Sequence, residues 1–174
     1  ANVPKFEGET LVVMDVSASM RGIASDTASL FGAILSKVNN CDVMTFAREA
    51  NYMAYNPMDS VLTIRDGFRF AGGGTNFKSI FTTANKKYDR IIILSDMQGW
   101  VGYTTPSDEF NQYKNMFGAT PFVYSWDLAG YGTLQFPENN VFALAGFSDK
   151  VFDIMKLMEV DKKALFNEIK SIQL

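Results

Sequence analysis

The chain has 174 residues, of which 47% are hydrophobic and 20% charged, so it is long and apolar enough for one folded domain and is not a disordered chain. Its 16 basic and 19 acidic side chains give a net charge of −3, which argues against a strongly basic nucleic-acid-binding surface. It contains no histidine and one cysteine, Cys41, which excludes histidine-based triads, internal disulfides and cysteine clusters for zinc.

The first half of the chain predicts strands alternating with a helix. Residues 10–14 are continuously aliphatic or β-branched, as in a short buried strand. Residues 41–46 and 51–55 read as two strands joined by a polar turn, which predicts a hairpin, and residues 61–64 as a further short strand. Between the first two strands, a helix ending at Asn39-Asn40 is expected to place the following side chains on one apolar face: Ile23, Thr27, Leu30, Phe31, Ile34 and Val38.

The second half continues the alternation. A helix capped by Thr75-Asn76 is predicted, with its apolar face formed by Phe77, Ile80, Phe81, Ala84 and Tyr88. Residues 91–95, 121–126 and 141–145 read as buried strands, and a helix is expected between Pro106 and Gly118. Residues 148–174 predict an amphipathic helix that breaks near residues 160–161.

This order of elements predicts a single domain, residues 1–174, of the three-layer α/β class. Its central sheet should be mostly parallel, with one antiparallel edge strand from the hairpin and helices on both faces. Function in such a sheet belongs at the carboxyl ends of the strands. Three loops there stand out by composition, namely residues 15–20, 72–76 and 95–99.

The three loops carry hard oxygen ligands. Asp15, Ser17 and Ser19 alternate beyond a buried strand, and Thr75 and Asp96 add a hydroxyl and a carboxylate from neighbouring strand ends. Carboxylates and hydroxyls suit Mg²⁺, Mn²⁺ or Ca²⁺. The alternatives are structural: Asp15 and Ser17 could cap the following helix, and Asp96 could begin a turn.

The glycine run at residues 72–74 could likewise be a flexible turn or a phosphate cradle. It lacks the Gly-Lys-Ser/Thr of a P-loop, which argues against nucleotide binding.

The pattern Asp15-Val16-Ser17-Ala18-Ser19, followed by Thr75 and Asp96, resembles the metal-ion-dependent adhesion site of von Willebrand factor type A (vWA) domains. The resemblance covers essentially the whole chain and implies the Rossmann-like vWA fold. It also implies that Ser17, Ser19 and Thr75 supply hydroxyl ligands, while Asp15 and Asp96 bind directly or through water. The implied ion is Mg²⁺, with Mn²⁺ or Ca²⁺ compatible.

A more specific likeness is to the carboxy-terminal vWA domain of the Ro/TROVE RNA-binding proteins. It rests on residues 72–75 (Gly-Gly-Gly-Thr), 94–98 (Leu-Ser-Asp-Met-Gln) and 145–152 (Ala-Gly-Phe-Ser-Asp-Lys-Val-Phe). That family joins a ring of helical repeats, which binds RNA, to the vWA domain. The likeness implies a ribonucleoprotein context in which RNA is bound only indirectly, through a repeat region that this chain lacks. The chain begins without Met, so it is expected to be processed or cut from a longer protein.

Three functions follow as hypotheses. The first is a binding module, in which a Glu or Asp of a protein partner completes the coordination of the ion. The second is a metal-dependent phosphoryl-transfer enzyme, disfavoured because residue 17 is serine where such folds carry a second carboxylate, and because the chain has no histidine. The third is direct binding of RNA, disfavoured by the net charge of −3.

The remaining expectations concern surroundings. Trp100, Tyr103 and Tyr131 fall in predicted loops, where they could touch a partner. Cys41 is expected to be a buried, apolar-type residue. No apolar run approaches the length of a membrane span and no signal peptide is visible, so a cytoplasmic protein without membrane contact is expected.

Overall fold

The computed structural model describes residues 3–70, 72–96, 106–128, 140–145 and 149–172. The chain divides into two compact units, one of residues 5–146 and one of residues 1–4 with 147–174. The larger unit contains the sheet and the candidate site. In the smaller unit the main element is a helix, α5, Asp149–Ile172.

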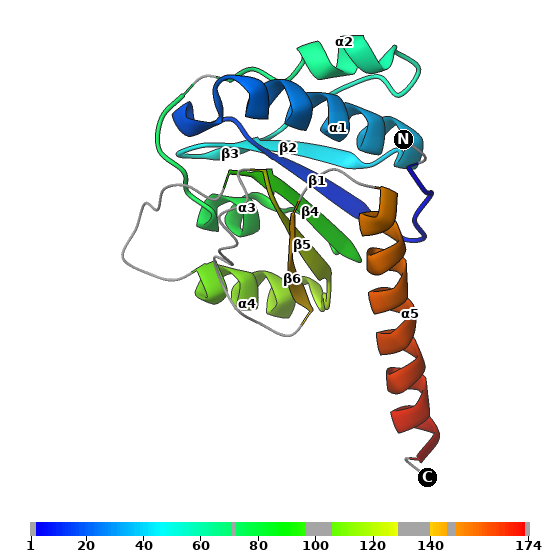
Figure 1. Cartoon of the computed structure of the whole chain (residues 1–174). Helices are drawn as coiled ribbons and strands as arrows, with labels where there is room; N and C mark the ends of the chain where they lie inside the picture. The colour runs from blue at the N-terminus through cyan, green and yellow to red at the C-terminus, as the bar shows by residue number, and fades with distance from the viewer. Residues whose placement is uncertain (1–2, 71, 97–105, 129–139, 146–148, 173–174) are drawn as a thin grey trace. The chain divides into compact units, whose positions relative to one another are not determined.

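The described residues of the larger unit form a six-stranded sheet in the order β3-β2-β1-β4-β5-β6 (Figure 1). Its strands are β1 (Thr10–Asp15), β2 (Asp42–Phe46), β3 (Ala50–Tyr52), β4 (Arg90–Ser95), β5 (Phe122–Asp127) and β6 (Val141–Ala145). All neighbours are parallel except β2 and β3, which form an antiparallel hairpin at the edge. The predicted mostly parallel sheet with one antiparallel edge strand is confirmed.

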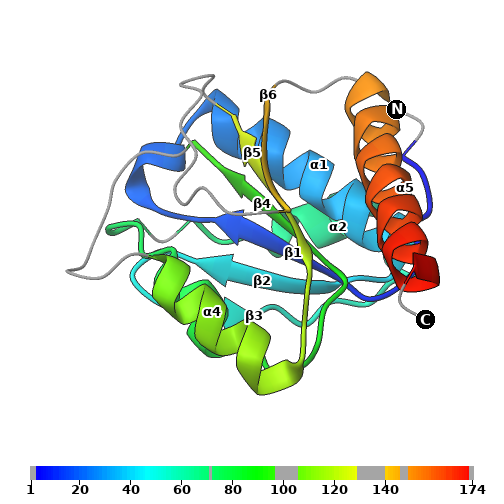
Figure 2. The same cartoon turned by 90° about the horizontal axis from the view of Figure 1, so that it is seen from below.

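Helices cover both faces of this sheet. Helix α1 (Ile23–Asn39) and the short α2 (Val61–Asp66) lie on one side, and α3 (Lys78–Thr83) and α4 (Pro106–Phe117) on the other (Figures 1 and 2). The predicted three-layer α/β architecture is therefore correct. Among the described helices, none combines the length and apolar character that a bilayer span requires.

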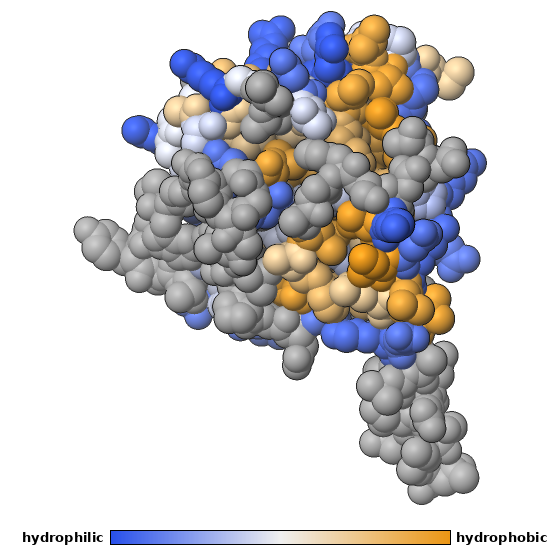
Figure 3. All heavy atoms as spheres, in the orientation of Figure 1, coloured by the Kyte–Doolittle hydropathy of each residue, from blue (hydrophilic) through white to orange (hydrophobic). Residues whose placement is uncertain are grey.

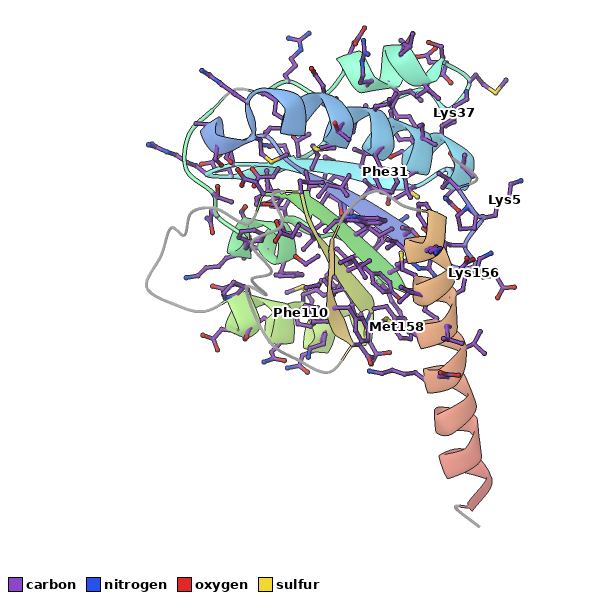
Figure 4. All side chains as sticks on the ribbon, in the orientation of Figure 1. Lys5, Phe31, Lys37, Phe110, Lys156 and Met158 are labelled. Atoms are coloured by element: carbon purple, nitrogen blue, oxygen red, sulfur yellow. The ribbon has the colours of Figure 1, made fainter. Side chains whose placement is uncertain are left out.

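The two central strands supply both halves of the core. Along β1 and β4, Val13 and Ile93 join the cluster that packs beneath α3 and α4. The next residues, Met14 and Leu94, point to the opposite face, toward α1. Figure 4 shows Phe31 and Phe110 on α1 and α4, on the two sides of the sheet. Burying one such side chain contributes about 1.5–3 kcal/mol, so the central strands are fixed firmly in place beneath the loops that follow them.

The predicted apolar face of α1 is only partly right. Phe31 is buried and packs edge-on against the Trp126 ring at 4.7 Å, but Leu30 is 39% exposed. Opposite β1 and β4, α1 carries Gly32, where a Cβ would lie 2.8 Å from the Met14 Cε. Close approach of helix to sheet thus selects small side chains, which a hydrophobic pattern does not detect.

The strand predicted at residues 61–64 is wrong, since this segment begins α2. Ser60 caps the helix, its Oγ accepting from the Thr63 N–H at 3.1 Å. A four-residue apolar run does not distinguish strand from helix, and the cap decides here. Figure 3 shows hydrophobic surface over α1 and α2, and Leu30 of α1 and Leu62 of α2 are exposed.

Two further helix predictions need correction. Helix α3 ends at Thr83, before Tyr88, because Asn85 turns to Tyr52: the Tyr52 hydroxyl accepts from its N–H and donates to its Oδ1. Its N-terminal cap position is Phe77, so Thr75-Asn76 do not cap it. Helix α5 runs without interruption through residues 160–161, and its sequence contains neither proline nor glycine.

Candidate metal centre

A buried carboxylate stands at the end of β1. Asp15 is fully buried, and its Oδ1 accepts from the Ser17 backbone N–H at 2.9 Å. Its Oδ2 accepts from the Ser95 Oγ at 2.6 Å. Ser95 ends β4, and the pairing of Met14 with Leu94 places it beside Asp15. The two central strands therefore fix both carboxylate oxygens.

A row of hydroxyls leads from Asp15 toward the surface. The Oγ atoms of Ser17 and Ser19 lie 3.2 Å apart, and the Ser19 Oγ donates to the Asp96 Oδ1 at 3.2 Å. Ser17 and Asp96 are buried, whereas Ser19 is exposed. The structure thus brings four of the five predicted ligands together, with the open side at Ser19.

Backbone hydrogen bonds attach the loop that carries Thr75. The Ala18 N–H donates to the Gly73 carbonyl at 3.2 Å, and the Gly72 N–H donates to the Val16 carbonyl at 3.3 Å. Gly72 and Gly73 have φ of 84° and 102°, a conformation that favours glycine. Thr75 follows them and is buried. The glycine run is therefore an irregular segment bonded to the loop after β1, and it brings Thr75 to the edge where Asp15 and Asp96 lie.

The donor set fits a hard divalent cation. Neighbouring ligands of an octahedral Mg²⁺ stand about 3.0 Å apart when each is about 2.1 Å from the ion. Both oxygen–oxygen separations, Ser17 to Ser19 and Ser19 to Asp96, are close to that value. Within the described residues no group of three or more Asp, Glu, Cys or His side chains could hold a metal. An ion at this edge would therefore rest on hydroxyls as well as on carboxylates.

Electrostatics favour a cation at the same place. Burial raises the pKa of the Asp15 carboxyl above its ordinary value. Hydrogen bonds from Ser17 and Ser95 lower that pKa in part, and the charge of Asp96 raises it further. A divalent ion would offset both the burial of the Asp15 charge and the repulsion from Asp96.

The capping alternative does not describe these residues. Ser17 precedes a short 3-10 turn, residues Ala18–Met20, without a side-chain cap, and α1 begins after Gly22, which also offers none. Asp15 instead bonds to its own loop and to β4.

Three neighbours of the site were not predicted from the sequence. Ser95 ends the predicted strand 91–95 and begins the predicted loop 95–99, and no contact with Asp15 was predicted for it, although its position follows from the strand register. Arg21 and Arg48 lie against Gly72 and Gly73. These contacts depend on loop packing, for which the sequence carries no signal.

Asp127 ends β5 and is buried, and it pairs with Ser95 in the strand register, so it lies at the same edge as the predicted ligands. An acidic residue that ends a buried strand is the same signal as Asp15. Trp100, Tyr103 and Tyr131, expected to touch a partner, lie outside the described residues.

Comparison with known proteins supports the fold. A scan against protein-family models finds no match, and a search of the curated proteins finds no relative. Among solved structures, the Ro (RSR) protein of Deinococcus radiodurans has a TM-score of 0.67 at 20% identity, over 85% of this chain and 33% of that one. Proximal thread matrix protein 1 from the mussel byssus has a TM-score of 0.55 at 16% identity, over 86% of this chain and 46% of that one.

These likenesses confirm the predicted vWA-like α/β fold, which this chain shares with part of the Ro protein. The chain spans about a third of the length of that Ro chain.

Proposed function

We propose that this chain is a divalent-metal-dependent protein-interaction module. Mg²⁺, or alternatively Mn²⁺ or Ca²⁺, binds among Asp15, Ser17, Ser19, Thr75 and Asp96, and a Glu or Asp of a partner completes the coordination. The observation that carries the proposal is the row of oxygens from Ser17 through the exposed Ser19 to Asp96, beside the buried Asp15. Such a row of oxygens would bind an ion on one side and leave the other side of the ion open to solvent.

The chemistry of the donor atoms supports binding of an anionic ligand and not catalysis. Hydroxyl ligands are neutral, so an ion held largely by Ser17, Ser19 and Thr75 keeps much of its positive charge and attracts an anionic oxygen. A base would be needed to activate a bound water for attack. Both oxygens of Asp15 already accept hydrogen bonds, and the carboxylate is fully buried, so Asp15 is not available as that base.

The likeness to the Ro protein supports a ribonucleoprotein context for this module. In that arrangement RNA is bound by other parts of the assembly and the metal site joins a protein component to it. The net charge of −3 fits a domain that does not itself hold RNA.

Calorimetric titration with Mg²⁺ and Mn²⁺ tests the ion site. Thr75→Ala should weaken binding about tenfold or more, because it removes a ligand oxygen. The matched control is Thr82→Ala, which removes an exposed threonine hydroxyl on α3 and should leave the affinity unchanged. Equal affinity in Thr75→Ala and the native chain would refute the ligand set.

The grip on a carboxylate is tested by NMR titration with a peptide that carries one glutamate between glycines. Binding should be lost in EDTA and restored by Mg²⁺ or Mn²⁺. Binding that persists in EDTA would show that the ion does not mediate the contact.

A further inference from the structure

We propose that Arg21 and Arg48 form a second anchor beside the metal, which selects partner segments carrying two acid groups. One acid group would bind the ion and the other would bind the guanidinium groups. The inference rests on the proposed function and deepens it, because it specifies the chemistry of the partner.

Arg21 and Arg48 lie next to two consecutive glycines, Gly72 and Gly73, of the loop that leads to Thr75. A Cβ placed on Gly72 would stand 3.2 Å from the Arg21 Nη2. A Cβ placed on Gly73 would stand 3.7 Å from the Arg48 Cγ and 3.8 Å from its Nε. Arg21 follows Ser19 by two residues, and Gly73 precedes Thr75 by two, so both arginines lie against the loop that carries the proposed ligand Thr75.

The position of Arg48 is set by backbone contacts. The turn between β2 and β3 bonds to the ligand loop through Asn76, whose N–H donates to the Ala47 carbonyl at 2.7 Å. The Asn76 Nδ2 also donates to the Arg48 carbonyl at 3.0 Å. The backbone of Arg48 is thereby held two residues from the end of β2, next to the loop that carries Thr75.

The charges of these arginines are available. Arg21 and Arg48 are exposed, and neither makes an ion pair with a described residue. Arg65 on α2, by contrast, pairs with Asp66 at 2.8 Å. Glu49, in the same turn as Arg48, also forms no ion pair within the described chain.

The strand order gives the anchor a direction. Arg21 follows β1 and Arg48 follows β2, whereas the buried Asp127 ends β5, on the far side of β4. Arg21 and Arg48 thus lie on the hairpin side of the proposed ion, where Glu49 is the neighbouring acid, and the buried Asp127 lies on the other side. A partner segment should place its second acid group toward the hairpin.

A carboxylate and a phosphate both suit the fork of a guanidinium. The acidic balance of the whole chain, −3, repels a long polyanion but affects a short acidic peptide less. In an extended peptide, side chains two residues apart point the same way, about 7 Å from each other. A short segment of the form Glu-x-Glu is therefore the simplest partner that offers one acid group to the ion and a second to the arginines.

The test uses two synthetic peptides, one with a single glutamate between glycines and one with Glu-Gly-Glu between glycines, titrated with Mg²⁺ present. The Arg21→Gln/Arg48→Gln double variant should bind the two-acid peptide about three- to twentyfold more weakly. It should bind the one-acid peptide within about twofold of the native chain. The matched control, Arg65→Gln, should change neither affinity.

Mg²⁺ affinity separates this inference from the proposed function. The double variant removes two positive charges near the proposed ion, so its affinity for Mg²⁺ should be equal to that of the native chain or slightly higher. Its affinity for the two-acid peptide should be lower. Misfolding would weaken both, so it does not produce this pair of effects. If the double variant binds Mg²⁺ normally and both peptides as the native chain does, the anchor is wrong and the metal site stands. If the native chain binds no Mg²⁺, the proposed function itself fails.

A single-stranded RNA oligonucleotide serves as the competing probe. The inference predicts that it binds more weakly than the two-acid peptide at equal salt. Tight RNA binding that is lost in the double variant would overturn the assignment, because the arginines would then be reading phosphates.

Discussion

Replacing Asp15 by asparagine tests whether its carboxylate serves metal binding or the stability of the fold. Asparagine preserves the shape: its Oδ1 can accept from the Ser17 N–H and its Nδ2 can donate to the Ser95 Oγ, the two groups that bond to Asp15 now. What changes is the charge of a fully buried group. The two states of the site, with and without ion, should respond to that change in opposite directions.

Without metal, the charge of Asp15 costs stability. Its pKa is raised from 3.8, chiefly by burial, so the native state binds the Asp15 proton more tightly than the unfolded state does. This contribution favours the native state at low pH and is lost as the pH rises above 3.8 toward the native pKa. In EDTA at pH 7, Asp15→Asn should therefore be at least as stable as the native chain, and its advantage should shrink toward pH 4.

With metal, the order should reverse. An ion present at 100 times its dissociation constant stabilises the native state by about 2.7 kcal/mol. For a domain of this size, each kcal/mol shifts Tm by about 2–4 °C, so Mg²⁺ should raise the Tm of the native chain by about 5–10 °C. The variant, which lacks the charge that the ion offsets, should shift by less than about 2 °C.

Thermal unfolding in EDTA and in saturating Mg²⁺, at pH 7 and at pH 4.5, measures all of these quantities. Asp26→Asn is the matched control, because Asp26 is an exposed acid in the first turn of α1, and it should retain the whole Mg²⁺ shift. An equal Mg²⁺ shift in Asp15→Asn would refute the role of the charge. A large loss of stability in EDTA would show that Asp15 is kept for the fold.

Three other predictions concern the body of the domain. Gly32→Leu should lower the free energy of unfolding by about 1–3 kcal/mol without altering Mg²⁺ affinity, since its Cβ would already lie 2.8 Å from the Met14 Cε; an unchanged urea midpoint would contradict this. Cys41 is buried and burial raises its pKa to about 12, so a thiol reagent at pH 8 should react only after denaturation, and rapid native labelling would be contrary evidence. Burial also raises the pKa of Tyr55 and Tyr113 to about 12; because the native state keeps these protons longer, the stability they contribute is full below pH 10 and should fall above it, as urea midpoints from pH 8 to 11 would show.

Six of the seven predicted strands, and the mostly parallel sheet with one antiparallel edge strand, could be predicted because the sheet is built from short, nearly continuous apolar runs; the order of the strands within the sheet was not predicted. What could not be predicted was how the helices meet the sheet. Helix α1 approaches the sheet closely at Gly32, while Leu30 is exposed, so the hydrophobic pattern indicated a helix correctly and misplaced part of its buried face. The apolar run at residues 61–64 is compatible with a strand or a helix, and the cap formed by Ser60 favours the helix that the structure shows.

In the candidate site, too, local features could be predicted from the sequence and contacts between distant segments could not. The alternation of Asp15, Ser17 and Ser19 is local, and it predicts that they face the same side if the strand continues. Ser17 and Ser19 do lie together, but through the 3-10 turn of residues Ala18–Met20 and not through an extended strand. The contact between Ser19 and Asp96 joins residues 77 positions apart and follows only once β1 and β4 are placed side by side. The arginines beside Gly72 and Gly73 depend on how three loops pack, which no spacing encodes.

The loops of the site are held by their backbones, and this determines how substitutions there should be interpreted. Val16 N–H donates to the Phe46 carbonyl at 2.9 Å, Ala18 N–H to the Gly73 carbonyl and Asn76 N–H to the Ala47 carbonyl. None of these bonds uses the side chain of a proposed ligand. Replacing a ligand hydroxyl by alanine should therefore remove one donor from the site and leave the loops where they are, so that a loss of Mg²⁺ affinity reports coordination and not collapse of the edge.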